Sequence, residues 1–199
     1  MNSRWRWIII AITLALAAAI VWQRATAIPP GNLAGSSLGG AFALVDQNGR
    51  PVTDRDFAGE YRLMYFGYTF CPDVCPTDVG LIARGLVDFE KARPERGARV
   101  TPIFITVDPE RDDVAAIKAF VAAFHPRLVG LTGTPAAITA ARKTFGIYSR
   151  KVTTSDPGNY LVDHFAVIYL FGPDGEPIAF VPHGSTAADI TALLQTYVR

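Results

Sequence analysis

The sequence has few cysteines, few methionines and almost no excess of charge. Its 199 residues include two Cys, two Met and three His, and the net charge is +1 at pH 7. Two cysteines cannot form the disulfide framework of a small secreted scaffold, and a chain of this length buries enough apolar surface to fold without one. Because acidic and basic residues are interspersed, no basic patch predicts binding to nucleic acid. With no internal repeat or low-complexity run after the N-terminal segment, we expect one domain of ordinary size.

Apolar residues dominate the N-terminal segment, residues 1–27, as far as Trp22, and Arg4 and Arg6 lie at its start. A helix of about 20 apolar residues spans the hydrocarbon core of a bilayer, and flanking positive residues stay in the cytoplasm. We therefore expect a cytoplasmic tip and a single-pass transmembrane anchor in the inner membrane, with the rest of the chain facing the periplasm. The alternative is a cleaved signal peptide, because residues 25–27 have the small-x-small pattern of a cleavage site. Both interpretations export the domain.

Residues 28–40 contain several Gly, Ser and Pro and have no apolar period. This composition predicts a flexible linker, so we expect the folded domain at residues 41–199. The domain begins with a predicted β-hairpin whose primed turn lies at Asn48-Gly49. A short helical turn capped by Thr53 follows.

Apolar runs predict buried strands in the rest of the chain, and apolar residues at helical spacing predict helices. In chain order these are strand 63–68, a helix from Pro76 to about Lys91, strand 102–107, helix 114–124, strand 128–131, helix 135–145, an irregular polar stretch, strands 165–171 and 177–181, and a helix capped by Thr186 and Asp189. Alternation of strands and helices predicts parallel pairing, and the last two strands form an antiparallel hairpin. The order predicts a thioredoxin-like α/β fold, a mixed central sheet flanked by helices, with an added N-terminal hairpin.

Cys71 and Cys75 lie where a predicted buried strand turns into a helix. The free amides and the dipole of a helix N-terminus favour anions, which lowers thiol pKa values and favours the thiolate that binds metals or attacks disulfides. Their spacing brings both sulfurs to one side, close enough to share a metal ion or to form a disulfide. A purely structural disulfide is the alternative, but so short a loop gains little stability from closure. We therefore expect a reactive dithiol.

Three histidines are candidates for a third metal ligand. His164 directly precedes the predicted strand 165–171, at the mouth of the sheet, from where it can reach the sulfurs. His125 lies at the end of a predicted helix and His183 at a strand-to-helix turn. We interpret both as structural or solvated, because neither approaches the cysteine turn in the predicted topology.

Two thiolates and one imidazole form a soft donor set, which suits Cu(I) in a three-coordinate site and can also hold Cu(II). Zinc takes four ligands, and Asp163 or water can supply the fourth, so zinc stays open as an alternative. Met64, the only methionine besides the first residue, lies within a predicted buried strand. The chain is therefore no methionine-rich copper carrier, and the predicted metal ligands are Cys71, Cys75 and His164.

Four segments of the domain carry a recognisable pattern. They are GYTFCPDVCPT at residues 67–77, TVDPERD at 106–112, GLTG at 130–133 and YLVDH at 160–164. Together they resemble the Sco (SenC) family of cytochrome c oxidase assembly proteins. The resemblance covers essentially the whole predicted domain, and the apolar N-terminal segment fits it as well.

The resemblance implies a thioredoxin fold in which copper is held by Cys71, Cys75 and His164. It also implies a role in maturing the dinuclear copper site of cytochrome c oxidase subunit II. That role consists of delivering copper, of reducing the cysteines of that subunit, or of both. Other copper carriers or thiol reductants are then further partners, and the membrane is reached through the N-terminal helix.

Two other functions would use the same cysteines. A dedicated thiol-disulfide reductase would use Cys71 and Cys75 as a redox dithiol that keeps the cysteines of the oxidase subunit reduced, and no sequence feature forbids it. A peroxiredoxin-like peroxidase also places a cysteine at a helix N-terminus. The residue seven positions before Cys71 is Met64, however, which breaks the Pro-x-x-x-Thr-x-x-Cys arrangement of that class. The four-residue spacing of the cysteines and the presence of His164 favour metal binding, so we predict a metallochaperone and leave thiol-disulfide oxidoreductase activity open as the alternative.

Overall fold

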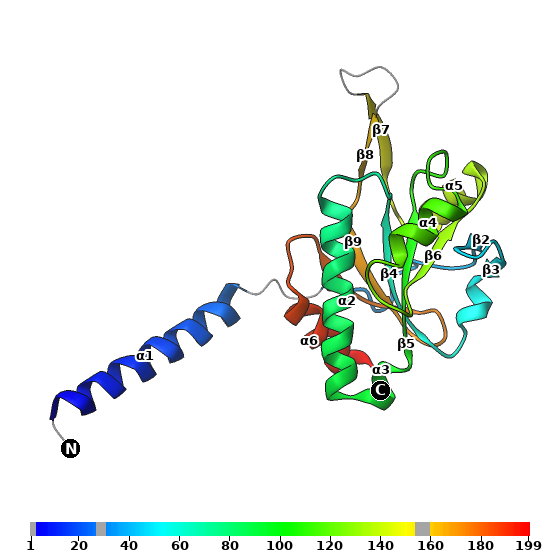
Figure 1. Cartoon of the computed structure of the whole chain (residues 1–199). Coiled ribbons are helices and arrows are strands. Elements are labelled where there is room, and N and C mark those ends of the chain that lie inside the picture. Colours follow the sequence, from blue (N-terminus) through cyan, green and yellow to red (C-terminus); the bar gives the residue numbers. More distant parts are fainter. Residues whose placement is uncertain (1–2, 27–30, 154–159) are drawn as a thin grey trace.

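The computed structural model describes residues 3–26, 31–153 and 160–199 (Figure 1). In chain order the elements are α1 (Ser3–Thr26), β1 (Gly31–Asn32), β2 (Ala43–Asp46), β3 (Pro51–Thr53), the 3₁₀ helix η1 (Asp54–Phe57), β4 (Tyr61–Gly67), α2 (Val74–Ala92), α3 (Pro94–Gly97), β5 (Val100–Thr106), α4 (Val114–Val121), β6 (Val129–Thr132), α5 (Pro135–Thr144), β7 (Ser149–Thr153), β8 (Tyr160–His164), β9 (Val167–Phe171), β10 (Pro177–Pro182) and α6 (Ala187–Tyr197). This is the predicted α/β organisation.

Eight strands form one mixed sheet in the order β1-β10-β9-β4-β5-β6-β2-β3. Strands β4, β5 and β6 are parallel, and the remaining neighbours in this sheet pair antiparallel. Within the described residues, β7 and β8 pair only with each other, and they form a hairpin that projects from the domain (Figure 1). Parallel strands end at the same edge of a sheet, so the loops that follow β4 and β5 meet there.

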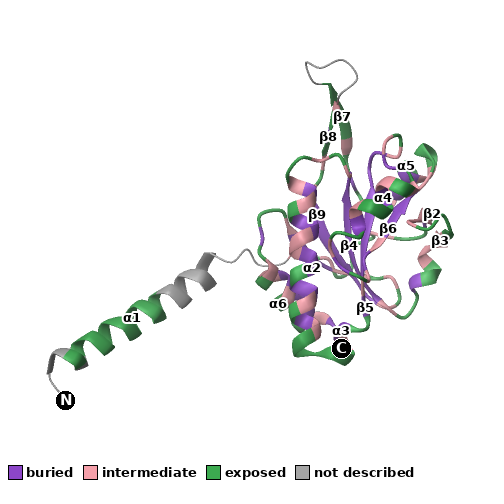
Figure 2. Cartoon of the chain, viewed as in Figure 1, coloured by how far each residue is buried: buried purple, intermediate pink, exposed green. Residues whose placement is uncertain are grey.

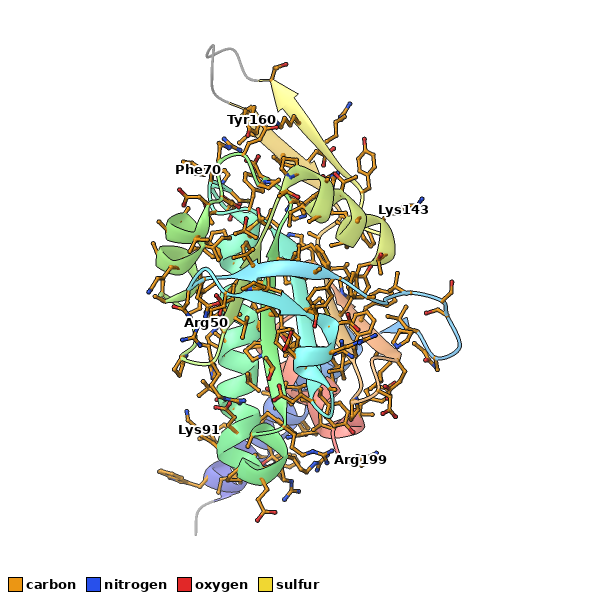
Figure 3. All side chains as sticks on the ribbon, turned by 90° about the vertical axis from the view of Figure 1, so that its right-hand side faces the viewer. Arg50, Phe70, Lys91, Lys143, Tyr160 and Arg199 are labelled. Atoms are coloured by element: carbon orange, nitrogen blue, oxygen red, sulfur yellow. The ribbon has the colours of Figure 1, made fainter. Side chains whose placement is uncertain are left out.

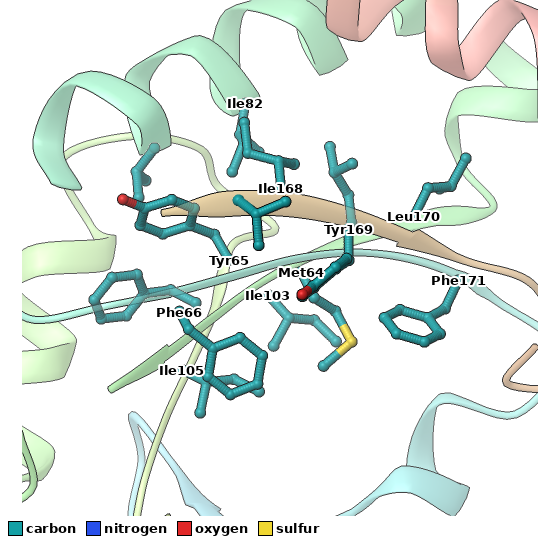
Figure 4. Packing of buried hydrophobic residues seen from close by; sticks show 14 of the residues in the cluster. Met64, Tyr65, Phe66, Ile82, Ile103, Ile105, Ile168, Tyr169, Leu170 and Phe171 are labelled. Carbon is teal, nitrogen blue, oxygen red and sulfur yellow. The ribbon is translucent and has the colours of Figure 1, made fainter. Parts of the chain in front are cut away.

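The two central strands form the core of the domain, because β4 is buried throughout and β5 almost throughout. Side chains alternate along a strand. Phe104 of β5 therefore points to α4, where its ring centroid lies 4.8 Å from that of Phe120. Phe66 of β4 points to the other face, with its ring centroid 5.4 Å from that of Phe145. Figure 4 shows Phe66 and Ile82 of α2 on opposite sides of these strands.

The helices cover both faces of the sheet. Helix α2 lies on one face with α6 packed against it, and α5 lies on the other face beside β2. The predicted core positions of α2 are buried: Val79, Ile82, Leu86 and Phe89. Figure 2 shows the resulting pattern, in which the central strands are buried and the outer surfaces of the helices are exposed.

Most of the predicted elements of the domain are confirmed with shifts of a few residues. Thr53 precedes η1, and its backbone amide and hydroxyl both donate hydrogen bonds to Oδ2 of Asp56. Thr186 and Asp189 form the predicted capping box of α6. The prediction of a primed turn at Asn48-Gly49 is wrong, because a type I′ turn needs a positive φ at both central residues. Among these two, Gly49 alone has a positive φ, of 79°.

The stretch that the sequence predicted to be irregular contains the hairpin β7–β8. Its residues pair antiparallel, with Ser149 opposite His164 and Val152 opposite Leu161. The sequence signal was missed because β7 is polar and mostly exposed. The hairpin consequently places His164 at the end of a strand rather than in a loop.

Part of the predicted linker at residues 28–40 belongs to the domain. Gly31–Asn32 forms β1 at the edge of the sheet, where it pairs with β10. The backbone amide of Leu33 also donates to the carbonyl of Ile178 at 3.0 Å. Residues 31–33 are therefore hydrogen-bonded to the sheet of the predicted domain 41–199, whereas residues 28–30 lie outside the described part of the chain.

The N-terminal segment forms the predicted helix, α1. Over the ranges that the structure describes, no helix combines the length and the apolar character needed to cross a membrane.

The packing of α6 on α2 requires a glycine at one position of α2. A Cβ atom on Gly85 would lie 2.8 Å from the carbonyl oxygen of Ala187 and from Cβ of Ile190. A Cβ atom on Gly80 of the same helix would meet the flexible end of Arg84 at 3.3 Å and Cε1 of Phe124 at 4.0 Å, an ordinary van der Waals contact. Gly80 is thus a matched control for Gly85.

We predict that Gly85→Ala destabilises the protein by about 1–3 kcal/mol, because the overlap outweighs the gain in helix propensity. Gly80→Ala should stabilise it by up to about 1 kcal/mol. Urea unfolding followed by circular dichroism measures both. Equal stability of the two variants would show that α6 does not approach α2 this closely.

Candidate metal centre

Cys71 lies in the turn that connects the buried strand β4 to α2, and Cys75 follows at the start of that helix. The helix begins at Val74, two residues before the predicted start at Pro76, so Cys75 lies within its first turn. The free backbone amide of Cys75 donates to Sγ of Cys71 at 3.3 Å. This hydrogen bond is the predicted stabilisation of an anion by a helix N-terminus.

The two thiols differ strongly in acidity. A hydrogen bond from the Cys75 side chain, together with the Cys75 amide, lowers the pKa of Cys71 to about 5. The hydrogen bond to Cys71 and burial raise the pKa of Cys75. Cys71 is partly exposed and Cys75 is buried, and no disulfide joins them. At neutral pH the pair therefore consists of an accessible thiolate and a buried thiol that donates to it.

His164, the last residue of β8, reaches the same pair. Its Nε2 lies 3.3 Å from Sγ of Cys75, which confirms the prediction that the imidazole lies beside the sulfurs. Burial lowers the pKa of His164, so its ring is neutral at pH 7 and keeps a free electron pair. Its Nδ1 is buried and has no hydrogen-bond partner among the described residues.

Two tyrosine rings fix the plane of this imidazole. The ring centroid of Tyr68 lies 5.9 Å from that of His164 at an interplanar angle of 86°, and that of Tyr65 lies at 6.2 Å and 83°. Gly67 between them leaves room for the thiol, because a Cβ atom there would lie 3.0 Å from Sγ of Cys75. The sequence reasoning assigned no role to these three residues, and β4 gave no signal beyond its apolar character.

Asp112 ties the cysteine turn to the neighbouring strands. Its buried carboxylate accepts hydrogen bonds from the backbone amide of Thr69 at 3.0 Å, and from the hydroxyls of Thr69 and Thr106 at 2.6 Å each. Thr132 of β6 donates to the backbone carbonyl of Asp112 at 2.6 Å. Burial raises the pKa of this carboxyl. The segment 106–112 was identified in the sequence, but this function was not.

A cavity of about 420 Å³ opens beside the cysteines. Its walls are largely apolar and come from the cysteine turn, the hairpin and the loop after β10: Tyr68, Cys71, Pro72, Asp73, Val74, Val152, Leu161, Val162, Asp163, His164, Ala166 and His183. The prediction that His183 stays away from the cysteine turn is therefore wrong. Its Nδ1 lies 3.0 Å from Oδ1 of the buried Asp78, which orients the ring. Asp163 pairs with Arg150 at 3.7 Å instead of turning to the sulfurs.

The other residues considered in the sequence lie away from the thiols. His125 is buried and has its Nε2 3.4 Å from Oε2 of Glu90, which confirms a structural role. Met64 is fully buried in β4. Within the described ranges, no three His, Cys, Asp or Glu side chains already stand in a metal-holding arrangement. Sγ of Cys75 and Nε2 of His164 are nevertheless in direct contact.

We predict that iodoacetamide modifies Cys71 much faster than Cys75, because the thiolate is the reacting species. The rate at Cys71 should stay constant from pH 8 down to about pH 6. It should then fall about tenfold per unit below pH 5, as the pKa of about 5 requires. Mass spectrometry of peptides from the reduced chain measures both rates. Equal rates with a midpoint near the ordinary thiol pKa of about 8.5 would contradict the inequivalence.

Comparison with known proteins gives a consistent result. The SCO1/SenC family matches residues 31–199. The mitochondrial SCO1 homologue of Mus musculus is 38% identical over 162 residues, covering 81% of this chain and 56% of that protein. The mitochondrial SCO2 homologue of Danio rerio is 45% identical over 138 residues, covering 68% of this chain and 48% of that protein. This chain thus spans about half the length of such relatives.

A solved structure gives a similar match over nearly its whole length. The structure of Bradyrhizobium japonicum ScoI with copper bound is 42% identical and has a TM-score of 0.72. The match covers 81% of this chain and 99% of that one. The thioredoxin-like fold of the Sco proteins, with its mixed sheet and flanking helices, is therefore the fold of this chain.

Proposed function

The chain belongs to the SCO1/SenC family, and we propose from this premise that it binds copper through Cys71, Cys75 and His164 as a metallochaperone. Its proposed task is assembly of the dinuclear copper site of cytochrome c oxidase subunit II, the partner that the family implies. One observation carries the proposal: the neutral imidazole of His164 lies 3.3 Å from the buried sulfur of a cysteine pair whose other member is a thiolate. Copper is bound in the similar Bradyrhizobium protein.

The chemistry of the three donors fits copper. Thiolates and imidazole are soft or intermediate ligands, which favour Cu(I) and also accept Cu(II). Asp163 is turned towards Arg150, and no carboxylate completes the four-ligand set that a structural zinc site uses. The absence of such a carboxylate refers to residues 3–26, 31–153 and 160–199. Copper is the cargo of such a site rather than a resident cofactor.

Binding requires the protein to release a proton. Cys71 is already a thiolate at neutral pH, but Cys75 must lose the proton that it donates to Cys71. An incoming ion reaches the partly exposed Cys71 first, through the cavity, and its charge then favours deprotonation of Cys75. Transfer to a partner reverses this order. A ligand of the partner can replace the thiolate of Cys71 first, and Cys75 and His164 then release the ion.

The same sulfurs cannot hold copper and form a disulfide at once. Oxidation removes two electrons and joins Sγ of Cys71 to Sγ of Cys75, which removes both thiolate ligands. The low pKa of Cys71 stabilises the reduced form and makes such a disulfide easy to reduce. A thiol reductant is therefore a required partner whenever the pair has been oxidised.

A second candidate function, thiol-disulfide reduction of the oxidase subunit, follows from the asymmetry of the pair. The Cys71 thiolate would attack a disulfide sulfur of the substrate and form a mixed disulfide. Cys75, as a thiolate, would then attack Sγ of Cys71 and release the substrate as a dithiol. His164 is needed for the copper site and not for this exchange, so it separates the two functions.

We predict that Cys71→Ser, Cys75→Ser and His164→Ala each weaken Cu(I) binding by more than about 100-fold, since even outer-shell changes cost 10–100-fold. His125→Ala should leave the affinity unchanged, and His183→Ala should change it little although it lines the same cavity. Anaerobic competition titration of the reduced chain measures all five. His164→Ala should still reduce a model peptide disulfide.

Tight Cu(I) binding without His164 would refute the three-ligand site. Loss of disulfide reduction together with copper binding in His164→Ala would instead show that the imidazole serves the thiol chemistry. Equal losses in His183→Ala and His164→Ala would move the third ligand to the other side of the cavity.

We also propose that the domain functions outside the cytoplasm, because an N-terminal segment of this kind exports the rest of the chain either as an anchor or as a cleaved signal peptide. Support comes from the arginines that precede the apolar residues of α1 and from the copper chemistry of the dithiol. A reporter that is active only in the periplasm, fused after Arg199, should be active in a Gram-negative host. A fusion that is active only as a cytoplasmic reporter would contradict export.

A further inference from the structure

A guanidinium group connects the strand that carries His164 to the loop after β5. Nε of Arg111 lies 2.5 Å from Oδ2 of Asp108, and its Nη1 donates to the backbone carbonyl of Tyr160 at 2.9 Å. The hydroxyl of Tyr160 donates in turn to Oδ1 of Asp108 at 2.7 Å. The three residues therefore form a closed ring of hydrogen bonds between this loop and β8.

The closed ring of hydrogen bonds formed by Asp108, Arg111 and Tyr160 is largely shielded from water. The side chain of Asp108 is completely buried and that of Arg111 is 18% exposed. Partial burial and the neighbouring Asp108 raise the pKa of Tyr160 to about 12, so its hydroxyl remains a donor at neutral pH. Charge-assisted hydrogen bonds in such an environment are stronger and more directional than exposed ion pairs.

The same guanidinium also contacts the cysteine turn. Its central carbon lies 3.6 Å from the ring centroid of Tyr160, 5.0 Å from that of Phe70 and 5.7 Å from that of Tyr68. Phe70 directly precedes Cys71, and Figure 3 shows Phe70 and Tyr160 at the same end of the domain. Arg111 thus touches both segments that bring the sulfurs and the imidazole together, through cation–π contacts on one side and hydrogen bonds on the other.

The hairpin depends on such side-chain contacts for its position. Within the described residues, β7 and β8 hydrogen-bond as strands to each other and not to the eight-stranded sheet. Lys151 of β7 also pairs with Glu110 at 2.5 Å, but these side chains are 47% and 57% exposed. An exposed pair of this kind contributes little, whereas the shielded contacts of Arg111 act on the ligand-bearing strand itself.

We propose that Arg111 is a positioning residue for copper: it holds β8, and with it the imidazole of His164, in place against the cysteine turn. The proposal rests on the proposed copper function of Cys71, Cys75 and His164. Loss of Arg111 removes one set of contacts that hold β8 against the cysteine turn, so that part of the hairpin must become ordered when copper binds. Substituting a residue that holds a metal ligand in place changes metal affinity by about 10–100-fold.

The test compares Cu(I) affinities of the reduced full chain by anaerobic competition titration. Arg111→Met, which keeps an apolar stem, should weaken binding about 10–100-fold. Arg111→Lys should bind Cu(I) more tightly than Arg111→Met but less tightly than the unsubstituted chain. The ammonium group of lysine lacks the planar fork of N–H donors that a guanidinium presents. Glu110→Gln in the same loop is the matched control and should stay within about twofold.

A double-mutant cycle distinguishes positioning from a general effect on the fold. If Arg111 acts through His164, Arg111→Met should cause no further loss of Cu(I) affinity in a His164→Ala background. Hydrogen exchange should also become faster at the amides of β7 and β8 and remain unchanged in β4 and β5. If Arg111→Met does not fold, Tyr160→Phe removes one bond of the ring and should weaken binding by up to about tenfold.

Unchanged Cu(I) affinity in Arg111→Met and in Tyr160→Phe would overturn the proposal. An equal loss with and without His164 would also overturn it, since the residue would then act on the cysteines or on the whole fold. Failure of the unsubstituted chain to bind Cu(I) would refute the proposed function itself, which is a separate outcome.

Discussion

The contact between Sγ of Cys75 and Nε2 of His164 is the interaction on which the arrangement of the site depends. It joins two segments 89 residues apart in the chain, at 3.3 Å. Two independent parts of the fold must be in place for it to form. One is the turn from β4 into α2, and the other is the hairpin β7–β8. Any change that displaces either part separates the soft donors, whatever its effect on overall stability.

The surroundings of this contact limit how far its two partners can move. Tyr65 and Tyr68 enclose the imidazole, and the carboxylate of Asp112 holds the backbone at Thr69. A buried thiol and a neutral imidazole lose their hydration without gaining a full set of hydrogen bonds, and His164 Nδ1 is an example. A bound cation would draw on both free electron pairs. The polar groups that lose their hydration in the metal-free fold therefore belong to Cys75 and His164, two of the proposed copper ligands.

The fold could be predicted from the sequence where burial makes apolar residues contiguous, as in a buried strand, or makes them recur at helical spacing. The apolar runs of β4 and β5 and the helical spacing of Val79, Ile82 and Leu86 gave the central elements. The hairpin β7–β8 could not be predicted, because its exposed strand β7 carries no apolar pattern. The edge strand β1 was missed for a related reason, since two residues form no period.

The candidate site was predicted through residue type and spacing, which place Cys71, Cys75 and His164 without any coordinates. The residues around them were not predicted. Tyr65 looks like any core aromatic in a buried strand, and Asp112 and Arg111 become informative only when the loop after β5 is seen beside the cysteine turn. Local patterns carry no information on contacts between parallel strands and distant hairpins. The cavity position of His183 was misjudged for the same reason.

X-ray absorption spectroscopy of the reduced chain, loaded anaerobically with one equivalent of Cu(I), would identify the atoms that bind the ion. We expect two sulfur donors and one nitrogen donor, because the chain brings two thiols and one imidazole together. Two sulfurs and no nitrogen would remove His164 from the site. Coordination without sulfur would refute copper binding by Cys71 and Cys75.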